Sequence, residues 1–397
     1  MIYRYIVFVI LFLDAIVLLF QTSQVSLSFH EAQVLYGNFS FLQLLIKSSI
    51  SLFGENDFGL RLVMIVLHLL SASLIYKISL RYIKSTKNRV WLLLTFVLLP
   101  GVVSSAIVVD EAGLVIFGLL LFIYLSEKIS QLKLALFSLL LVLVSGSFSY
   151  LFLALFIYFI YQKKYNYSLY YFFLFIFSNL LFGSDVGGYP QGHFLDTLGV
   201  FSAILTPIIF LYIIYTLYRR YLSSKIDLLW FISSIPFLFS IVISFRQGIP
   251  IEHFAPYLIV ALPIAAQTFI SSYRVRLKNF RSKYRMIFLI SFLFLAVNSI
   301  AVLFNKELYL FLEKPRKHFA YDMHVAKELA LQLKAKDIHC VKTDYEMQKR
   351  LQFYKIGKCK SFLLRKKERD LVDKNDVTIS YKNKIIYSAS VTNINNR

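Results

Sequence analysis

Long apolar runs separated by short polar segments occupy residues 1–306 of the chain. The runs show no alternation of apolar and polar positions, so they are read as helices and not as strands. A bilayer core requires about 20 mostly apolar residues per helix, and only helices or closed barrels pair every backbone group there. We therefore predict about eleven transmembrane helices, at 2–20, 58–80, 90–109, 111–126, 133–145, 148–161, 168–183, 197–218, 226–245, 254–272 and 286–305.

Four of these runs differ from an ordinary internal span. Residues 2–20 lack a small-residue cleavage site, so we expect them to be retained as a span and not removed as a signal peptide. The runs at 111–126, 133–145 and 148–161 are short, so they are tilted or form a hairpin broken at residues 145–147.

The pattern changes after residue 310, where the composition becomes that of a soluble domain. Apolar spacing there predicts helices at 321–335 and 344–354, and strands at 338–342 and 359–364. A hairpin of 377–381 and 384–390 is expected around Asn383. The predicted fold class is thus an all-α polytopic membrane protein, residues 1–306, with a small C-terminal α/β domain, residues 310–397.

Composition supports a membrane protein over a soluble one. The chain is 58% hydrophobic and only 16% charged, whereas an average soluble protein carries about 25% charged residues. This excludes an ordinary cytosolic enzyme, a disordered chain and a disulfide-framework protein. The net charge of +21 is divided by long apolar runs, unlike the continuous basic face of a nucleic-acid-binding domain. We therefore expect membrane lipids, and no nucleic acid, as partners.

The basic residues predict the orientation of the spans. Alternate polar segments, including the N-terminus, hold 18 of the 43 basic residues, while the intervening segments at 110–111, 145–149 and 184–196 hold none. By the positive-inside rule the N-terminus is cytoplasmic and the C-terminal domain lies outside, which is the periplasm for a bacterial inner membrane. Cys340 and Cys359 both fall in this outer domain, where they form either a disulfide or two buried thiols.

Ionisable residues gather in the loops predicted to face outside, whereas the middles of the spans are nearly uncharged. Near a membrane such residues are costly and are functional candidates. Some have an ordinary alternative. In a purely structural reading, His30 and Glu31 are solvated loop residues, Asp110 and Glu111 are a helix cap, and Arg61 is an interfacial side chain. His68 is expected to be packed and hydrogen-bonded. The candidates are His30 and Glu31, Asp110 and Glu111, His193, Arg246 and His253, together with Arg61 at the start of the second span.

The sequence contains no HExxH, paired CxxC, GxSxG or GxxxxGK[ST] motif. Metalloprotease, serine-hydrolase and nucleotidase functions therefore have no motif support. We expect no resident cofactor, and a divalent cation is left open.

One segment resembles a known family. Phe53, Gly54, Phe58 and Arg61 match F-G-x-x-x-F-x-x-R at the entry of the second span, and a short second loop with Asp110 follows. This arrangement is similar to that of the glycosyltransferase C superfamily, specifically family 39 and its relatives, the protein O-mannosyltransferases and the aminoarabinose transferases of lipid A. The stretch His253-Phe254-Ala255-Pro256-Tyr257 resembles the H-Y-x-x-P segment of those families.

The resemblance implies inverting transfer of a sugar from a polyprenyl-phosphate donor to a lipid, glycan or protein acceptor at the outer face. Glu31 aligns with the general base and Asp110 with the acid of the second loop, while His30 stands where the family has its first acid. Residues 38–41 replace a proline-containing segment. The remaining substrate-binding set comprises Arg61, Arg246 and His253, expected at the phosphate, together with Glu111 and His193.

Two other classes of function stay open. A transporter or flippase of lipid-linked glycans places charges and broken helices near the bilayer midplane, and the crowding of ionisable residues at one face favours a transferase over it. A catalytically inactive member could serve as a scaffold through the outer domain, which carries a net charge of +10 in residues 310–397.

Overall fold

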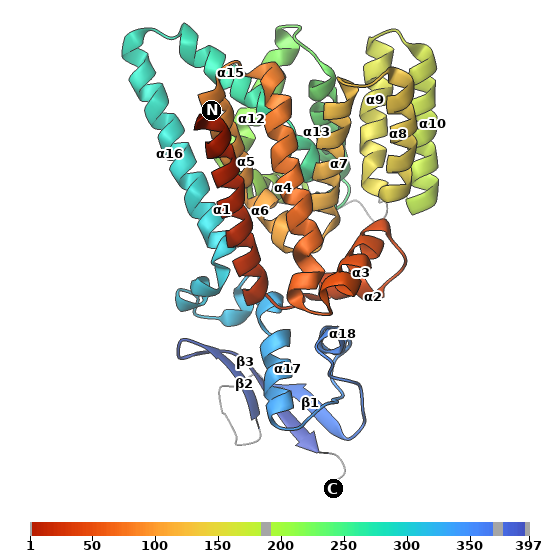
Figure 1. Cartoon of the computed structure of the whole chain (residues 1–397), viewed down its shortest axis with the longest axis vertical. Coiled ribbons are helices and arrows are strands. Elements are labelled where there is room, and N and C mark those ends of the chain that lie inside the picture. Colours follow the sequence, from red (N-terminus) through yellow and green to blue (C-terminus); the bar gives the residue numbers. More distant parts are fainter. Residues whose placement is uncertain (1, 184–191, 368–375, 394–397) are drawn as a thin grey trace. The chain divides into compact units, whose positions relative to one another are not determined.

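The structure, a computed structural model, describes residues 2–183, 192–367 and 376–393. It is predominantly helical, with eighteen α-helices and one three-stranded sheet in these residues (Figure 1). The chain forms two compact units, which do not follow the predicted boundary near residue 306. The first unit comprises Met1–Ile16, Met64–Ala106 and Asp110–Ser299, and the second comprises Val17–Val63, Ile107–Val109 and Ile300–Arg397. The segment predicted as the first outer loop thus groups with the C-terminal domain.

Every predicted apolar run coincides with one helix or with two consecutive helices. The helices are α1 Ile2–Gln24, α4 Asp57–Tyr82, α5 Thr86–Val97, α6 Pro100–Ile107, α7 Glu111–Ser126, α8 Gln131–Val144, α9 Ser149–Tyr161, α10 Tyr165–Phe182, α11 Phe194–Leu205, α12 Pro207–Leu222, α13 Leu228–Ser244, α14 Ile251–Ile259, α15 Leu262–Val275 and α16 Lys278–Leu303. A 3₁₀ turn at Gly146–Phe148 precedes α9, where the sequence predicts a break.

Within the described residues, four apolar helical segments are long enough to cross a membrane: Tyr3–Gln24, Asp57–Tyr82, Ile251–Val275 and Lys278–Leu303. Two bent pairs, α5 with α6 and α11 with α12, raise the number to six if each pair is one span. The other apolar helices are shorter than 18 residues. The helical and apolar character is therefore confirmed, while the number of eleven spans stays a prediction.

Prolines mark both bends. Pro100 begins α6 after a bend of 58°, and Pro207 begins α12 after a bend of 105°. A proline cannot donate a backbone hydrogen bond, and it disfavours the helical conformation of the residue before it. Thr206, the residue before Pro207, has a φ of 65° and a ψ of 145°, which lie outside the helical region. The breaks follow from local sequence, although the apolar pattern alone continues through them.

Small and aromatic side chains pack the core of the first unit. Gly118 of α7 lies against the ring of Phe148, and a Cβ atom at Gly118 would lie 2.4 Å from that ring. The rings of Phe159 and Tyr171 stack with their centroids 5.3 Å apart, joining α9 to α10. This packing fixes α7 beside the turn that precedes α9.

The second unit contains two helices that the hydrophobic pattern did not predict. Residues 21–57 were expected to be a loop, yet α2 spans Phe29–Tyr36 and α3 spans Phe41–Phe53. Ser28 and Glu31 form a capping box at the start of α2, in which each side chain bonds the other residue's backbone N–H. The cap gives this short helix a defined beginning.

The C-terminal part of the second unit is a small α/β structure, as predicted. It contains α17 Ala326–Ala335, α18 Tyr345–Phe353, β1 Phe362–Lys366, β2 Asp376–Tyr381 and β3 Lys384–Asn393. The antiparallel sheet has the order β1-β3-β2.

Details of this part differ from the sequence prediction at two segments. The predicted strand at 338–342 forms only isolated bridges, Cys340 to Gly357 and Lys342 to Leu363. The predicted helix from 321 becomes regular only at Ala326. The hairpin is confirmed, because Lys382 and Asn383 both have positive φ, as a tight two-residue turn requires. Cys340 and Cys359 form a disulfide.

Candidate functional site

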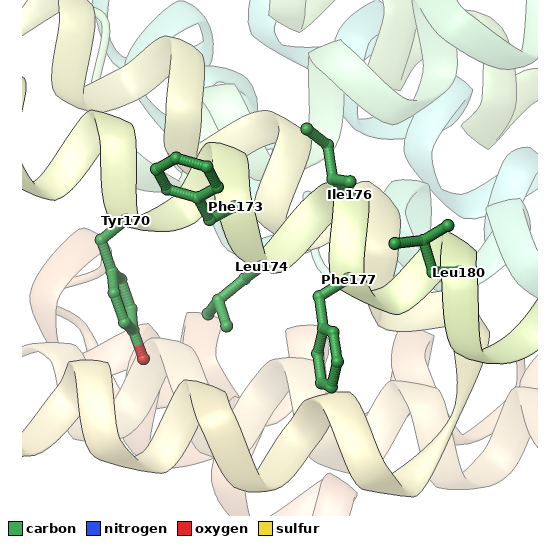
Figure 2. Close-up of a pocket in the computed structure, with 6 residues that line it drawn as sticks. All are labelled: Tyr170, Phe173, Leu174, Ile176, Phe177 and Leu180. Carbon is green, nitrogen blue, oxygen red and sulfur yellow. The ribbon is translucent and has the colours of Figure 1, made fainter.

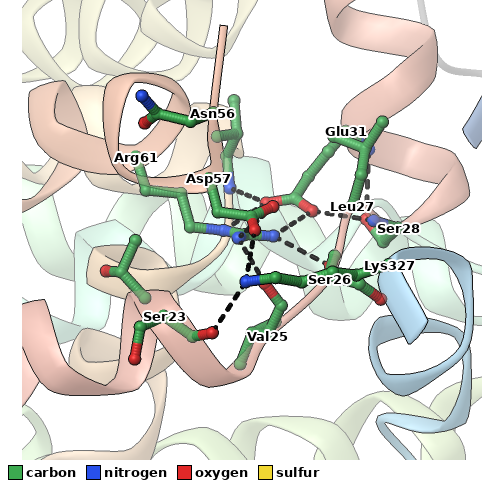
Figure 3. A network of polar contacts seen from close by, with 12 residues as sticks. Ser23, Val25, Ser26, Leu27, Ser28, Glu31, Asn56, Asp57, Arg61 and Lys327 are labelled. Carbon is green, nitrogen blue, oxygen red and sulfur yellow. Dashed lines mark hydrogen bonds and ion pairs between the residues drawn. The ribbon is translucent and has the colours of Figure 1, made fainter. Parts of the chain in front are cut away.

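Arg61 lies one turn into α4, and its side chain is fully buried. Its Nε and Nη2 atoms donate to the two carboxylate oxygens of Glu31 over 3.0 and 2.7 Å. Nη1 donates to the carbonyl of Val25, and Nη2 also donates to that of Ser26 (Figure 3). A guanidinium so enclosed by protein acceptors offers no open face to a lipid phosphate. This corrects the expected phosphate contact, and the full burial also argues against a side chain that extends to the membrane surface.

Glu31 is equally buried and accepts four hydrogen bonds. Besides the two from Arg61, it accepts one from the backbone N–H of Ser28 over 2.9 Å and one from that of Val109 over 3.1 Å. A carboxylate has about four acceptor positions, so an acceptor hydroxyl would have to displace an existing donor. The geometry therefore gives Glu31 a structural role, in contrast to the general base implied by the resemblance.

Asp57, the first residue of α4, extends this arrangement to the C-terminal domain. Its carboxylate lies 3.9 Å from Nη1 of Arg61. It accepts from Nζ of Lys327 over 2.8 Å and from the hydroxyl of Tyr354 over 2.7 Å. We call Glu31, Asp57, Arg61, Lys327 and Tyr354 the Arg61 network. All five residues belong to the second compact unit.

Sequence reasoning missed Lys327 and Tyr354, since neither belongs to a motif. Their participation depends on the folding of a distant domain. His30, in contrast, precedes Glu31 directly but is exposed on α2. The structure thus separates the two neighbours, because consecutive helical residues point in different directions.

A second cluster lies in the first compact unit, where Glu111 begins α7. Its Oε2 atom accepts from the hydroxyls of Ser145 and Ser147 over 2.5 and 3.2 Å. Nε2 of His253 lies 3.9 Å from the same oxygen. We call Glu111, Ser145, Ser147 and His253 the Glu111 cluster. The hydroxyl of Tyr257 donates to the carbonyl of Ser147 and holds the turn in place.

Asp110 is the N-cap of α7, and its side chain accepts from the backbone N–H of Ala112 over 3.1 Å. The capping alternative is therefore correct for this residue. The residue is nevertheless only half-buried. Glu111 and His253, predicted from separate outer loops, are brought together by the fold, and Asp110 precedes Glu111 in the chain.

His193 and Arg246 lie outside the Glu111 cluster. His193 occupies the N-cap position of α11 without a side-chain capping bond, and its Nδ1 lies 3.5 Å from the carboxylate of Asp196. Its backbone N–H donates to the carbonyl of Ser244, which joins this segment to the end of α13. Arg246 follows α13 and is exposed. Residues 184–191, most of the predicted loop before His193, lie outside the described residues.

A hydrogen-bonded pair of ionisable side chains occurs where the sequence pattern predicted only apolar helices. Oδ2 of Asp14 in α1 lies 2.7 Å from Nε2 of His68 in α4, and the two side chains are 15% and 3% exposed. His68 also stacks on Phe96, with ring centroids 6.2 Å apart. The expectation that His68 is packed and hydrogen-bonded is confirmed. Asp14 was missed, although an acid inside an apolar run signals a buried partner.

The surface of α10 bears an apolar groove of about 390 Å³ (Figure 2). Its one polar lining group is the hydroxyl of Tyr170, which donates to the carbonyl of Ala135. The groove therefore offers an apolar chain a surface, but no acid, base or cation. Its lining residues are Tyr170, Phe173, Leu174, Ile176, Phe177 and Leu180.

Among the described residues, no three His, Cys, Asp or Glu side chains are grouped as a metal site requires. Comparison with known proteins adds no family: no family model, no curated protein and no solved structure matches the chain. The chemical interpretation therefore rests on the residues themselves, on their geometry and on the sequence resemblance.

Proposed function

We propose that the protein transfers a sugar from a polyprenyl-phosphate donor to an envelope acceptor at the outer face of a bacterial inner membrane. One observation carries this proposal. The three parts of the resemblance, namely Glu31, the segment 53–61 and the second loop, share one hydrogen-bonded network. Glu31 binds Arg61 of that segment and also the N–H of Val109, which directly precedes Asp110. The motif residues are thus linked in space and not only in order.

Asp110 is the proposed general base, in place of the enclosed Glu31. In the reaction, the acceptor hydroxyl oxygen attacks the anomeric carbon of the sugar, and its proton passes to the Asp110 carboxylate. The bond between the anomeric carbon and the phosphate oxygen breaks, and its electron pair leaves on the phosphate. A positioned carboxylate typically contributes a factor of about 10²–10⁴ to such a step.

The leaving phosphate requires positive charge, which Arg61 does not supply. The proposed cations are the exposed guanidinium of Arg246 and a protonated His253. Both residues belong to the last segment that is predicted to face outside. Fixed charges of this kind stabilise the developing phosphate charge.

Substitution of Asp110 tests the assignment. Asparagine is as good a helix cap as aspartate, so Asp110→Asn should retain the fold while transfer falls by at least about 10². Asp344→Asn is the matched control, because Asp344 likewise caps a helix, α18. The readout is sugar transfer in membranes, after mass spectrometry of a knockout strain has identified the missing product. Normal transfer by Asp110→Asn would show that Asp110 is not the general base.

A flippase for a lipid-linked glycan is the second candidate, and the Asp14–His68 pair favours it. Paired ionisable groups inside apolar helices are typical of transport and proton pathways. In this case Asp14→Asn should abolish flipping of a fluorescent lipid-linked sugar in proteoliposomes, while Asp344→Asn retains it. Accumulation, in the knockout, of a donor that has already reached the outer leaflet would instead favour the transferase.

A further inference from the structure

The C-terminal domain contacts the first outer segment through two side chains of the second unit. The Tyr354 hydroxyl donates to Asp57 and accepts from the N–H of Leu27 over 2.8 Å. Nζ of Lys327 pairs with Asp57 and donates to the carbonyl of Ser23 over 2.9 Å. Tyr354 thus joins the start of α4 to the segment after α1, and Lys327 joins it to the last turn of α1.

These contacts continue without interruption to the second loop. Asp57 lies beside Arg61, Arg61 binds Glu31 through two hydrogen bonds, and Glu31 accepts from the N–H of Val109. Val109 and Asp110 share a peptide bond. The position of the Asp110 backbone is therefore coupled to side chains more than 200 residues further along the chain.

The charges of the Arg61 network balance. The two carboxylates of Glu31 and Asp57 face two cations, Arg61 and Lys327. The Glu31–Arg61 pair is wholly buried. Removing one partner of such a set leaves an uncompensated charge, and the other members must rearrange. Burial, followed by the charge of Asp57, raises the pKa of Tyr354 above its usual range, so the hydroxyl remains a donor.

We propose that Tyr354 and Lys327 are positioning residues, through which the C-terminal domain holds Asp110 in place for transfer. The inference rests on the proposed function for its catalytic part. Its structural part, the coupling of the domain to Val109, stands independently. The C-terminal domain is then part of the catalytic apparatus and not a separate binding module.

Hydrogen exchange tests the coupling without any assay of activity. In the full-length protein, Tyr354→Phe removes both hydrogen bonds of the hydroxyl and keeps the ring, and Lys327→Met removes the charge. We expect the N–H of Val109 to exchange at least tenfold faster in each variant. Lys327→Arg should restore slow exchange. The matched control is Tyr345→Phe, on an exposed tyrosine of α18, and it should leave exchange at Val109 unchanged.

Kinetics test the catalytic part. A misplaced Asp110 lowers kcat about tenfold in Tyr354→Phe with little change in KM, and Lys327→Arg keeps most of the activity. If Tyr354→Phe does not fold, Lys327→Met gives both readouts. Wild-type exchange at Val109 in the folded variants overturns the proposal. If the variants exchange fast at Val109 but the wild-type protein shows no transferase activity, the proposed function is rejected and the coupling is retained.

Discussion

At the scale of single residues, partners decide what an ionisable side chain can do. Glu31 and Asp110 are both acids that resemble functional residues of one family. Glu31 is enclosed by four donors, whereas Asp110 is half-buried at a helix start. A base must be able to reach the proton it removes. We therefore propose Asp110 as the base, whereas the four hydrogen bonds of Glu31 give it a structural role.

The buried ion pair makes a prediction about stability. Glu31→Gln removes the hydrogen-bonded counter-charge of the buried Arg61 guanidinium and leaves only the Asp57 carboxylate, at 3.9 Å. Breaking such a buried pair costs about 3–5 kcal/mol. We expect this decrease in the free energy of unfolding, measured in detergent by denaturant titration. His30→Gln, on the exposed neighbour, should change it by less than about 0.5 kcal/mol. Equal stability of the two variants would show that the pair does not form.

His324 makes a prediction about pH. Burial lowers its pKa from 6.5 to about 3, so the unfolded state binds a proton more readily than the folded state. The contribution of His324 is therefore complete above pH 6.5 and is lost as the pH falls toward 3, by up to about 4 kcal/mol.

Substitution by a neutral residue isolates this contribution. His324→Gln retains an acceptor for the Tyr309 hydroxyl, which lies 3.1 Å from Nδ1 of His324, but does not titrate. Between pH 6.5 and 3, unfolding of the C-terminal domain should become less pH-dependent in this variant than in the wild type. His339→Gln, on an exposed histidine, should follow the wild type. Parallel pH curves for His324→Gln and the wild type would exclude the predicted contribution.

At the scale of elements, local signals explain both the successes and the errors of the sequence reasoning. The apolar runs predicted the helices, but not the bends before Pro100 and Pro207, because hydropathy does not record a broken backbone. The short helix α2 was missed although Ser28 and Glu31 form a readable capping box. The strand expected at 338–342 forms only two isolated bridges. A strand requires continuous hydrogen bonding to a neighbouring segment, which the sequence of 338–342 alone does not specify.

The disulfide should stabilise α18, which Tyr354 directly follows. Cys340 and Cys359 are 19 residues apart and enclose α18, and closing a loop of this size contributes about 3 kcal/mol. Reductant should therefore lower the unfolding midpoint of the wild-type domain. The double variant Cys340→Ala/Cys359→Ala should unfold at the reduced midpoint with or without reductant. A wild-type midpoint insensitive to reductant, with the bond shown to be broken, contradicts this effect.

At the scale of the whole molecule, charge and hydropathy describe a helical membrane protein. Several helices are long and apolar enough to cross a bilayer, and basic residues gather in alternate segments. The two compact units do not follow the division into an apolar region and a C-terminal domain. Residues 17–63 and 107–109 group with the C-terminal domain. A boundary based on composition alone separates segments that contact each other.

Orientation is a prediction at this scale. Alkaline phosphatase, which is active only outside the cytoplasm, should be inactive when fused after residue 225 and active when fused after residue 397. The physical reason is the retention of basic loops on the cytoplasmic side. A green fluorescent protein fused at the same positions should give the complementary result. The reverse pattern at both positions would place the C-terminal domain inside.

The amino-acid sequence was sufficient for properties that depend on neighbours along the chain. These include the apolar helices and the hairpin around Asn383. The accessibility of Glu31 and the burial of Arg61 depended on tertiary structure. Their partners come from Val25, Ser26, Val109 and the C-terminal domain, far apart in sequence. Burial and hydrogen bonding are properties of such assembled surroundings, so a residue's type and position cannot specify its chemistry.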